Sequence, residues 1–276
     1  MGKKVNSRTG KVVFSVVMIL LGICMLYPFI MMVTISFRNS GSAYKGLFDS
    51  TVVHTLRNYR TVLSNRYFPS WYLNTVVTVT LTIALRLIIT ITAAYAFARL
   101  KFKGSKWIMA FLVATMMVPG ETTMVPRYLW YKSIGIIDSM WSIVLPEMSE
   151  IFYLILLVEF FQSIPEDFTE AAKIDGAGHG RILTQIFVPL SGPSITTTIL
   201  FSFINIWNNY LDPYLFIKTI DRQLITPALQ FFQQQGGANV PVQLAGSTLA
   251  LIPVILLFIF TQKYFVAGVS SSGIKG

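Results

Sequence analysis

The sequence predicts an all-α membrane protein with six transmembrane helices, and two observations carry this expectation. Of the 276 residues, 54% are hydrophobic and only 12% are charged, against roughly 25% charged in a typical soluble domain. The hydrophobic residues also fall into six continuous runs, each close to the roughly 20 residues that a helix needs to cross the hydrocarbon core of a bilayer. A membrane β-barrel would show alternating segments of about ten residues instead. We therefore expect one transmembrane domain over residues 1–276.

The first run, Val12–Ile35, contains no charged residue. It is too long for the hydrophobic part of a cleaved signal peptide, which covers roughly 7–15 residues. We therefore expect a retained first helix over residues 12–36. The other five runs are Leu73–Ala98, Trp107–Leu129, Trp141–Phe161, Phe187–Trp207 and Leu244–Phe260.

The third run is broken by Pro119-Gly120, which Glu121 follows. Proline removes a backbone donor and kinks a helix, and in a bilayer the freed backbone groups need protein or water as partners. The break is therefore predicted to face other helices or a cavity. Charged side chains inside a span are costly and indicate function by default, so Glu121 and Arg86 of the second run are candidates for a polar pathway. Arg86 has a second interpretation, in which it pairs with a carboxylate such as Glu121 for packing.

Basic residues predict the orientation of the chain, because those in short loops next to spans favour the cytoplasmic side. Two clusters place both termini in the cytoplasm, although five basic residues in the long loop 37–70 weaken the inference without reversing it. The net charge of +10 then reflects topology, and no nucleic-acid partner is expected. The two clusters are Lys3, Lys4, Arg8 and Lys11, and Arg99, Lys101, Lys103 and Lys106.

No pattern for catalysis, for a cofactor or for a metal is present. Cys24 is the only cysteine, and the two histidines, His54 and His179, fall on opposite sides of the predicted membrane. The phosphate-binding pattern G-x-x-x-x-G-K-[ST] is also absent. We expect no catalytic, metal-binding or cofactor-binding residues, and a chain that is not an enzyme.

One polar segment, residues 163–181, lies between the fourth and fifth runs and is predicted to be a short cytoplasmic helix. Ser163 and Glu166 have the spacing of a capping box, and Pro165 suits a first turn. Gly176 suits the left-handed position that ends many helices. A helix this short is marginal alone; it either docks on a partner, which the small Ala171 and Ala172 would allow, or rests on its own protein.

The same segment carries the sequence Glu170-Ala171-Ala172, then Gly176 and Ile186-Phe187-Val188-Pro189. This spacing resembles the EAA motif of permease subunits of ATP-driven, binding-protein-dependent importers, with Val188 where leucine is usual. Asn74, Ala94-Tyr95, Arg99 and Pro126 resemble the sugar-importing branch. Trp207-Asn208 does so too, although Asn209 and Tyr210 replace the Glu-Phe of that branch. The tail, residues 266–276, is similar to that of the second permease of maltose-type importers.

The resemblance implies a type I importer permease (MetI-like) fold with its core at residues 71–265. It implies that loop 163–181 couples the chain to an ATPase, and that the tail reaches between two ATPase subunits, which would hold the ATP and Mg. The other implied partners are a homologous second permease, an extracytoplasmic substrate-binding protein and the lipid bilayer of a bacterial cell. The ATPase-docking residues would be Glu170, Ala171, Ala172, Asp175, Gly176, Ile186 and Pro189.

The transported solute implied by the resemblance is a carbohydrate, most often an oligosaccharide. Amides that hydrogen-bond hydroxyl groups suit such a solute, so Asn205, Asn208 and Asn209 join Arg86 and Glu121 as pathway candidates. An alternative is an autonomous secondary carrier or channel for a small polar solute. That alternative requires ion-coupling carboxylates in facing spans and transport by the purified chain alone.

Overall fold

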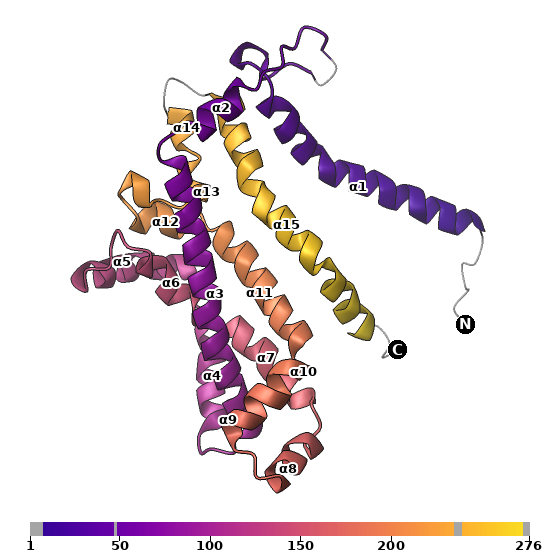
Figure 1. Cartoon of the computed structure of the whole chain (residues 1–276), viewed down its shortest axis with the longest axis vertical. Coiled ribbons are helices and arrows are strands. Elements are labelled where there is room, and N and C mark those ends of the chain that lie inside the picture. Colours follow the sequence, from indigo (N-terminus) through magenta and orange to yellow (C-terminus); the bar gives the residue numbers. More distant parts are fainter. Residues whose placement is uncertain (1–7, 47–48, 235–238, 273–276) are drawn as a thin grey trace. The chain divides into compact units, whose positions relative to one another are not determined.

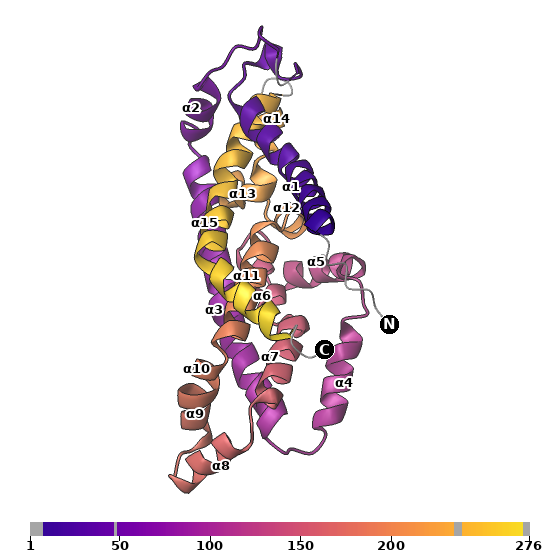
Figure 2. The same ribbon diagram turned by 90° about the vertical axis from the view of Figure 1, so that its right-hand side faces the viewer.

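The computed structural model describes residues 8–46, 49–234 and 239–272, with side chains described over 10–46, 49–232 and 239–262. These residues are helical (Figures 1 and 2), with one isolated antiparallel bridge, between Arg38 and His54, and no strand among them. The prediction of a helical membrane protein is thereby confirmed. Cα packing divides the chain into two compact units, and the single transmembrane domain expected from the sequence stays a prediction. The units are Met1–Phe68 with Leu229–Ile252, and Pro69–Ala228 with Pro253–Gly276.

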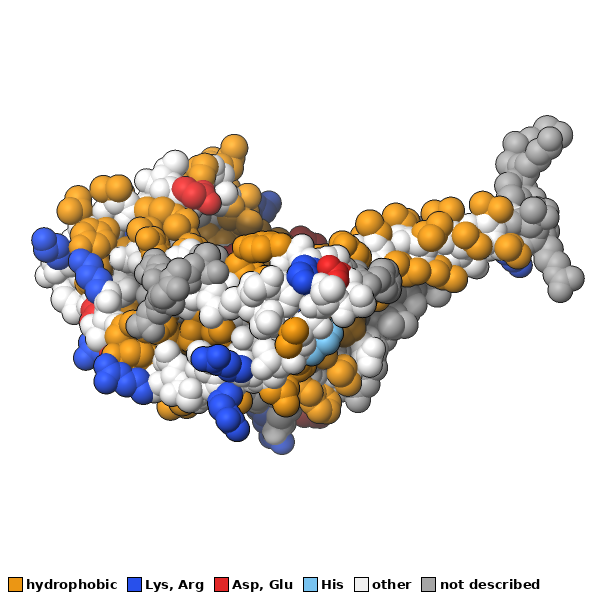
Figure 3. Space-filling view, turned by 90° about the horizontal axis from the view of Figure 1, so that it is seen from above, with side chains coloured by type: hydrophobic (Ala, Val, Ile, Leu, Met, Phe, Trp, Pro, Cys, Tyr) orange, Lys and Arg blue, Asp and Glu red, His pale blue; other side chains and the backbone are white. Residues whose placement is uncertain are grey.

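The first unit is built around a long hydrophobic helix. Its elements are α1 (Arg8–Ser36), η1 (Ser40–Ser42), α2 (Arg57–Leu63), α14 (Phe231–Gln234) and the first part of α15 (Val240–Ser272). Over Gly10–Ser36 the mean hydropathy reaches 2.6, and no residue of that most hydrophobic stretch is buried. Figure 3 shows hydrophobic side chains along α1. Such a surface is stable in lipid rather than in water, as expected of a membrane-spanning helix.

The loop that follows α1 is held by polar side chains. Asn58 of α2 donates from Nδ2 to the main-chain oxygens of Ser36 and Arg38, each 2.7 Å away. The Arg38 guanidinium, which is buried, donates to the main-chain oxygen of Lys45 at 2.6 Å. These bonds satisfy backbone groups that no helix or sheet would satisfy here.

The second unit contains the remaining elements. They are α3 (Phe68–Arg99), α4 (Ser105–Thr115), η2 (Gly120–Thr123), α5 (Met124–Ser133), α6 (Trp141–Glu147), α7 (Ile151–Ser163), α8 (Asp167–Ile174), α9 (His179–Ile182), the π-turn η3 (Leu183–Phe187), α10 (Val188–Leu190), α11 (Gly192–Trp207), α12 (Leu211–Phe216), η4 (Ile220–Arg222) and α13 (Ile225–Ala228).

Three of the six predicted spans are continuous helices within the described residues, namely those in α1, α3 and α15. The third predicted span bends by 90° between α4 and η2, and the fifth by 77° between α10 and α11. The kink predicted at Pro119 is therefore confirmed. The fourth predicted span consists of α6 and α7, of 7 and 13 residues, with a break at residues 148–150. Six spans remain a prediction, because three to five are long and hydrophobic enough to cross.

A hydrophobic core lies where α3 ends. Tyr95 of α3, Leu157 and Phe161 of α7, and Phe187 of the π-turn are buried there. The Phe187 ring packs edge-on against those of Tyr95 and Phe161, with centroids 5.2 and 5.3 Å away. Aromatic pairs in this geometry add stability beyond the area that they bury. The core thus fixes the helices from which the polar loop at residues 163–181 extends.

Candidate functional site

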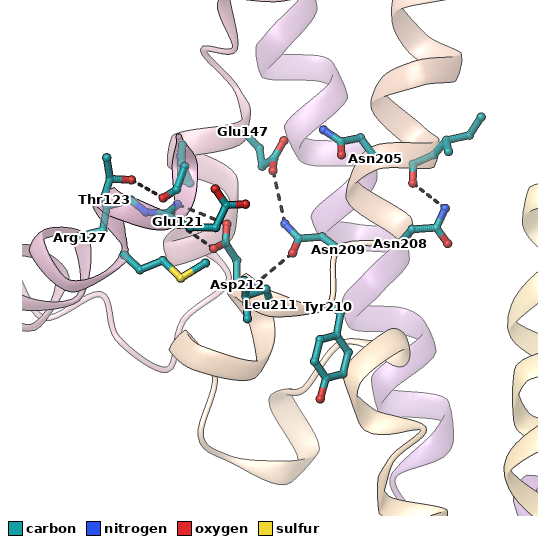
Figure 4. Close-up of a pocket in the computed structure, with 14 residues that line it drawn as sticks. Glu121, Thr123, Arg127, Glu147, Asn205, Asn208, Asn209, Tyr210, Leu211 and Asp212 are labelled. Atoms are coloured by element: carbon teal, nitrogen blue, oxygen red, sulfur yellow. Dashed lines mark hydrogen bonds and ion pairs between the residues drawn. The ribbon is translucent and has the colours of Figure 1, made fainter. Parts of the chain in front are cut away.

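A polar cavity of about 690 Å³ opens in the second unit, beside the bend in the third predicted span and the break in the fourth. Its walls come from η2 and α5, from the end of α6, and from the end of α11 with the start of α12 (Figure 4). Helix breaks place backbone and polar side chains inside a membrane protein only where a cavity or other protein receives them. The volume falls in the range typical of ligand-binding clefts.

The structure brings four of the five pathway candidates to this cavity, namely Glu121, Asn205, Asn208 and Asn209. In Figure 4 the side chains of Glu121 and Glu147 face those of Asn205 and Asn209 across one space. Within the described part of the chain, the side chains of Asn205 and Glu121 form no hydrogen bond to another residue. Both groups are exposed and free to contact a solute.

A chain of polar contacts around the cavity joins the end of α6 to α12 and α5. Asn209 donates from Nδ2 to Glu147 Oε1 at 3.4 Å, and its Oδ1 accepts the main-chain amide of Asp212 at 3.2 Å. Asp212 in turn binds the Arg127 guanidinium through both oxygens, at 2.7 and 3.3 Å. A bidentate pair fixes orientation as well as charge, so α5 and α12 are held together at the cavity.

Arg86, the fifth candidate, is wholly buried behind the cavity. Its guanidinium contacts Glu147 Oε2 at 2.9 Å and Glu150 Oε2 at 3.3 Å, and donates to Ser202 Oγ at 2.7 Å. The interpretation of Arg86 as a paired residue therefore fits the contacts, and the carboxylates are those of Glu147 and Glu150 rather than Glu121. Glu147 also lines the cavity, where its side chain is paired with Arg86 and is only 15% exposed.

Arg86 also completes the broken fourth span. α6 ends at Glu147, whose main-chain oxygen lacks the amide that a continuing helix would supply. The Arg86 Nε donates to that oxygen at 2.8 Å. One guanidinium thus satisfies the end of a helix and two carboxylates, which explains how a charge is tolerated among these helices.

The predicted cytoplasmic helix is α8, which lies beyond the last turn of α3 (Figures 1 and 2). It ends as predicted, because Gly176 has φ +74°, in the left-handed region. Its start differs from the prediction. Ser163 donates to the main-chain oxygen of Phe160 instead of capping α8, and the N-cap, Glu166, makes no side-chain capping bond. Pro165 precedes the N-cap and lies outside the helix.

The motif residues divide between exposed and packed positions. Glu170, Ala171, Asp175, Gly176 and Pro189 are exposed. Ala172 and Ile186 are partly buried and pack against the core around Phe161 and Phe187, and the docking role expected of Ala172 stays a prediction. Its side chain attaches α8 to the unit, while the opposite face stays open.

The outer face of α8 includes residues that the sequence reasoning missed. Ile174 is 87% exposed and Phe168 is 48% exposed, next to Glu170 and Asp175. The helical period could have identified Ile174, because a residue four positions after Glu170 lies on the same face of the helix. The outer face of α8 therefore carries two exposed hydrophobic side chains beside two carboxylates.

Two contacts tie this loop to the end of α3. Arg99 donates to the main-chain oxygen of Phe161 at 2.7 Å and also to that of Ile164, which caps the end of α7. The Tyr95 hydroxyl lies 3.0 Å from His179 Nδ1, at the start of α9. Movement of the loop must therefore displace α3 or break these bonds.

The cavity between bent membrane helices and the open helix at the end of α3 are features of a membrane transport permease. Comparison with known proteins agrees. The family model described as binding-protein-dependent transport system inner membrane component matches residues 87–271. This chain belongs to that family.

Relatives and a solved structure are similar over nearly the full chain. The maltodextrin permease MdxG of Bacillus subtilis is 30% identical, over 93% of each chain. The trehalose/maltose permease MalG of Thermococcus litoralis is 29% identical, over 94% of each. A bacterial ABC transporter that imports the acidic polysaccharide alginate matches with a TM-score of 0.83 and 25% identity, over 95% of this chain and 100% of that one. These are sugar ABC permeases, and the fold is the MetI-like permease fold.

Proposed function

We propose that this chain is one of two homologous permease subunits of an ATP-driven oligosaccharide importer in a bacterial cell membrane. It crosses six times with both termini in the cytoplasm, and the polar cavity is its half of the translocation pathway. Two ATPase subunits, which bind ATP and Mg, power alternating access. A binding protein delivers the sugar from outside.

The observation that carries this proposal is the open face of α8. It presents Glu170, Ile174 and Asp175 outward while Ala172 anchors the helix to its own core. A charged and hydrophobic surface on a short helix is suited to a cleft on a partner. The tail at residues 266–276 cannot support the proposal in the same way, since its side chains and residues 273–276 lie outside the described structure.

The substrates named for the relatives favour a sugar but differ in charge. Maltodextrin, trehalose and maltose are uncharged, whereas alginate is acidic. The asparagines and carboxylates of the cavity suit hydroxyl-rich solutes, because each can pair with hydroxyl groups. The autonomous carrier would need several ion-coupling carboxylates in facing spans, and arginines engage two of the three that line the cavity, Glu147 and Asp212.

The test is copurification in mild detergent with a matched pair of glycine variants. Gly176→Ala places a side chain at φ +74°, which strains the end of α8, whereas Gly180→Ala adds one in open space at an ordinary φ. We expect the wild type and Gly180→Ala to retain a second permease and two ATPase copies. Gly176→Ala should lose the ATPase while remaining folded. Recovery of this chain alone, with solute transport intact in vesicles, would contradict the proposal.

A further inference from the structure

The charges around the cavity are unbalanced. Glu121, Glu147 and Asp212 line it, against the single guanidinium of Arg127. Adding the buried Arg86 brings in Glu150 as well, because Arg86 contacts both Glu147 and Glu150. Four carboxylates then stand against two guanidinium groups, and two negative charges remain in excess.

Neither guanidinium is free to receive an anion from a solute. Arg127 donates through Nη1 and Nη2 to the two oxygens of Asp212, and its Nε is buried and out of reach of a solute. Arg86 has no exposed surface, and its three nitrogens are directed to Glu147, Glu150 and Ser202. A carboxylate on a solute would therefore have to displace a bidentate pair, or a buried one, to find a cation.

Glu121 is the carboxylate that a solute meets directly. It lies in η2, at the 90° bend that opens the cavity, and its side chain is exposed. No ion pair or hydrogen bond of the described residues engages its carboxylate. An ionised carboxylate accepts hydrogen bonds and donates none, so Glu121 attracts hydroxyl groups and repels a second carboxylate.

The asparagines complete a surface for uncharged, hydroxyl-rich molecules. The side-chain amide of Asn205 has no hydrogen-bond partner among the described residues. Asn208 donates one N–H to the main-chain oxygen of Ile204, at 2.9 Å, while its side-chain oxygen stays available. Amides both donate and accept, so they pair with hydroxyl groups in either sense. They offer no net charge to offset a carboxylate.

We propose that this cavity selects uncharged oligosaccharides against those that carry carboxylates, and that Glu121 is the residue that sets this selectivity. The inference rests on the proposed function, because it assumes that a sugar passes through the cavity. At the effective dielectric constant near a protein surface, repulsion between like charges several ångströms apart should slow entry of the charged sugar by on the order of tenfold or more.

The experiment uses the purified importer complex, with its binding protein, in proteoliposomes. The probes are maltotetraose, cellotetraose and arabinotetraose, each converted to its aldonate by oxidation and to its alditol by reduction. Aldonate and alditol share an open-chain end and differ in charge. Calorimetry first gives the affinity of the binding protein for each probe, and uptake is then measured with the binding protein saturated, so that delivery is equal.

For the wild type we expect the alditol to enter at least about tenfold faster than the aldonate. Glu121→Gln keeps the size of the side chain and removes its charge, and should narrow that ratio severalfold. Glu159→Gln removes a carboxylate from an exposed position of α7 that does not line the cavity, and should leave the ratio unchanged.

Two results would overturn the inference while leaving the importer intact. One is equal uptake of aldonate and alditol by the wild type, and the other is an unchanged ratio in Glu121→Gln. Absence of ATP-dependent uptake of any probe, charged or uncharged, would instead overturn the proposed function and this inference with it.

Discussion

Arg86 Nε lies 2.8 Å from the main-chain oxygen of Glu147, at the residue where α6 ends. The same guanidinium contacts the Glu147 carboxylate at 2.9 Å. A buried cation therefore replaces the missing amide of a broken helix and holds a carboxylate at the wall of the cavity. The broken fourth span depends on a residue 61 positions earlier in the chain.

Removal of this guanidinium should destabilise the protein. Arg86→Gln leaves the Glu147 carboxylate and main-chain oxygen without their cation, a loss of roughly 3–5 kcal/mol for a broken buried pair. Thermal unfolding of the purified protein in detergent measures it. Arg60→Gln, at an exposed position of α2, should change the stability by less than about 0.5 kcal/mol. Equal stability of the two variants would show that Arg86 does not hold the break.

The Arg127–Asp212 pair should show a measurable coupling energy. Its side chains are 20% and 13% exposed, and the two terminal nitrogens of Arg127 each contact an oxygen of Asp212. In a double-mutant cycle with Arg127→Lys and Asp212→Asn we expect roughly 0.5–3 kcal/mol. The comparison cycle uses Arg222 and Asp138, 3.4 Å apart with Arg222 64% exposed, for which about 0–1 kcal/mol is expected. Two equal coupling energies would refute the role given to the bidentate geometry.

Asp138 should make stability depend on pH. Burial raises the pKa of its carboxyl, but hydrogen bonds from the Thr219 hydroxyl and amide, from the Lys218 amide and the charge of Arg222 together hold that pKa below its usual value. A lowered pKa in the folded state stabilises the protein above the unfolded pKa of about 3.9, and this contribution is lost as the pH falls through the folded pKa.

Asp138→Asn tests this dependence, since asparagine also tolerates the φ of +64° at this position. Denaturant unfolding should give a lower stability than wild type at about pH 7, and the gap should narrow below about pH 4. Asp221→Asn, an exposed neighbour on η4, is the control. A gap for Asp138→Asn that stays constant with pH would contradict the prediction.

The hydrogen bond between Tyr95 and His179 should affect how ATP hydrolysis is coupled to transport, rather than how the subunits assemble. Tyr95→Phe removes the hydroxyl that lies 3.0 Å from Nδ1 and keeps the ring packed on Phe187. We expect ATPase subunits still to copurify, while the sugar moved per ATP falls severalfold, because loop movement reaches α3 less directly. Tyr44→Phe, at an 85% exposed position, is the matched control. An unchanged ratio of transport to ATP hydrolysis would rule out this route.

The sequence by itself determined the class of protein and its motif. Continuous hydrophobic runs require a bilayer, and Pro119-Gly120 marked a break that the structure bends by 90°. The left-handed Gly176 was also predictable, since a helix end with this chemistry is decided within a few residues. These features are local, so the sequence pattern contains them.

Only the tertiary structure decided the partners of the charges. The sequence left the carboxylate partner of Arg86 open, and the structure pairs it with Glu147, while Arg127 contacts Asp212 at a separation of 85 residues. The predicted capping box was wrong for a local reason, because Ser163 belongs to the end of α7 and donates to the main-chain oxygen of Phe160. Pairing between distant residues depends on which helix faces meet, and hydrophobic patterns alone leave many such arrangements nearly equal in energy.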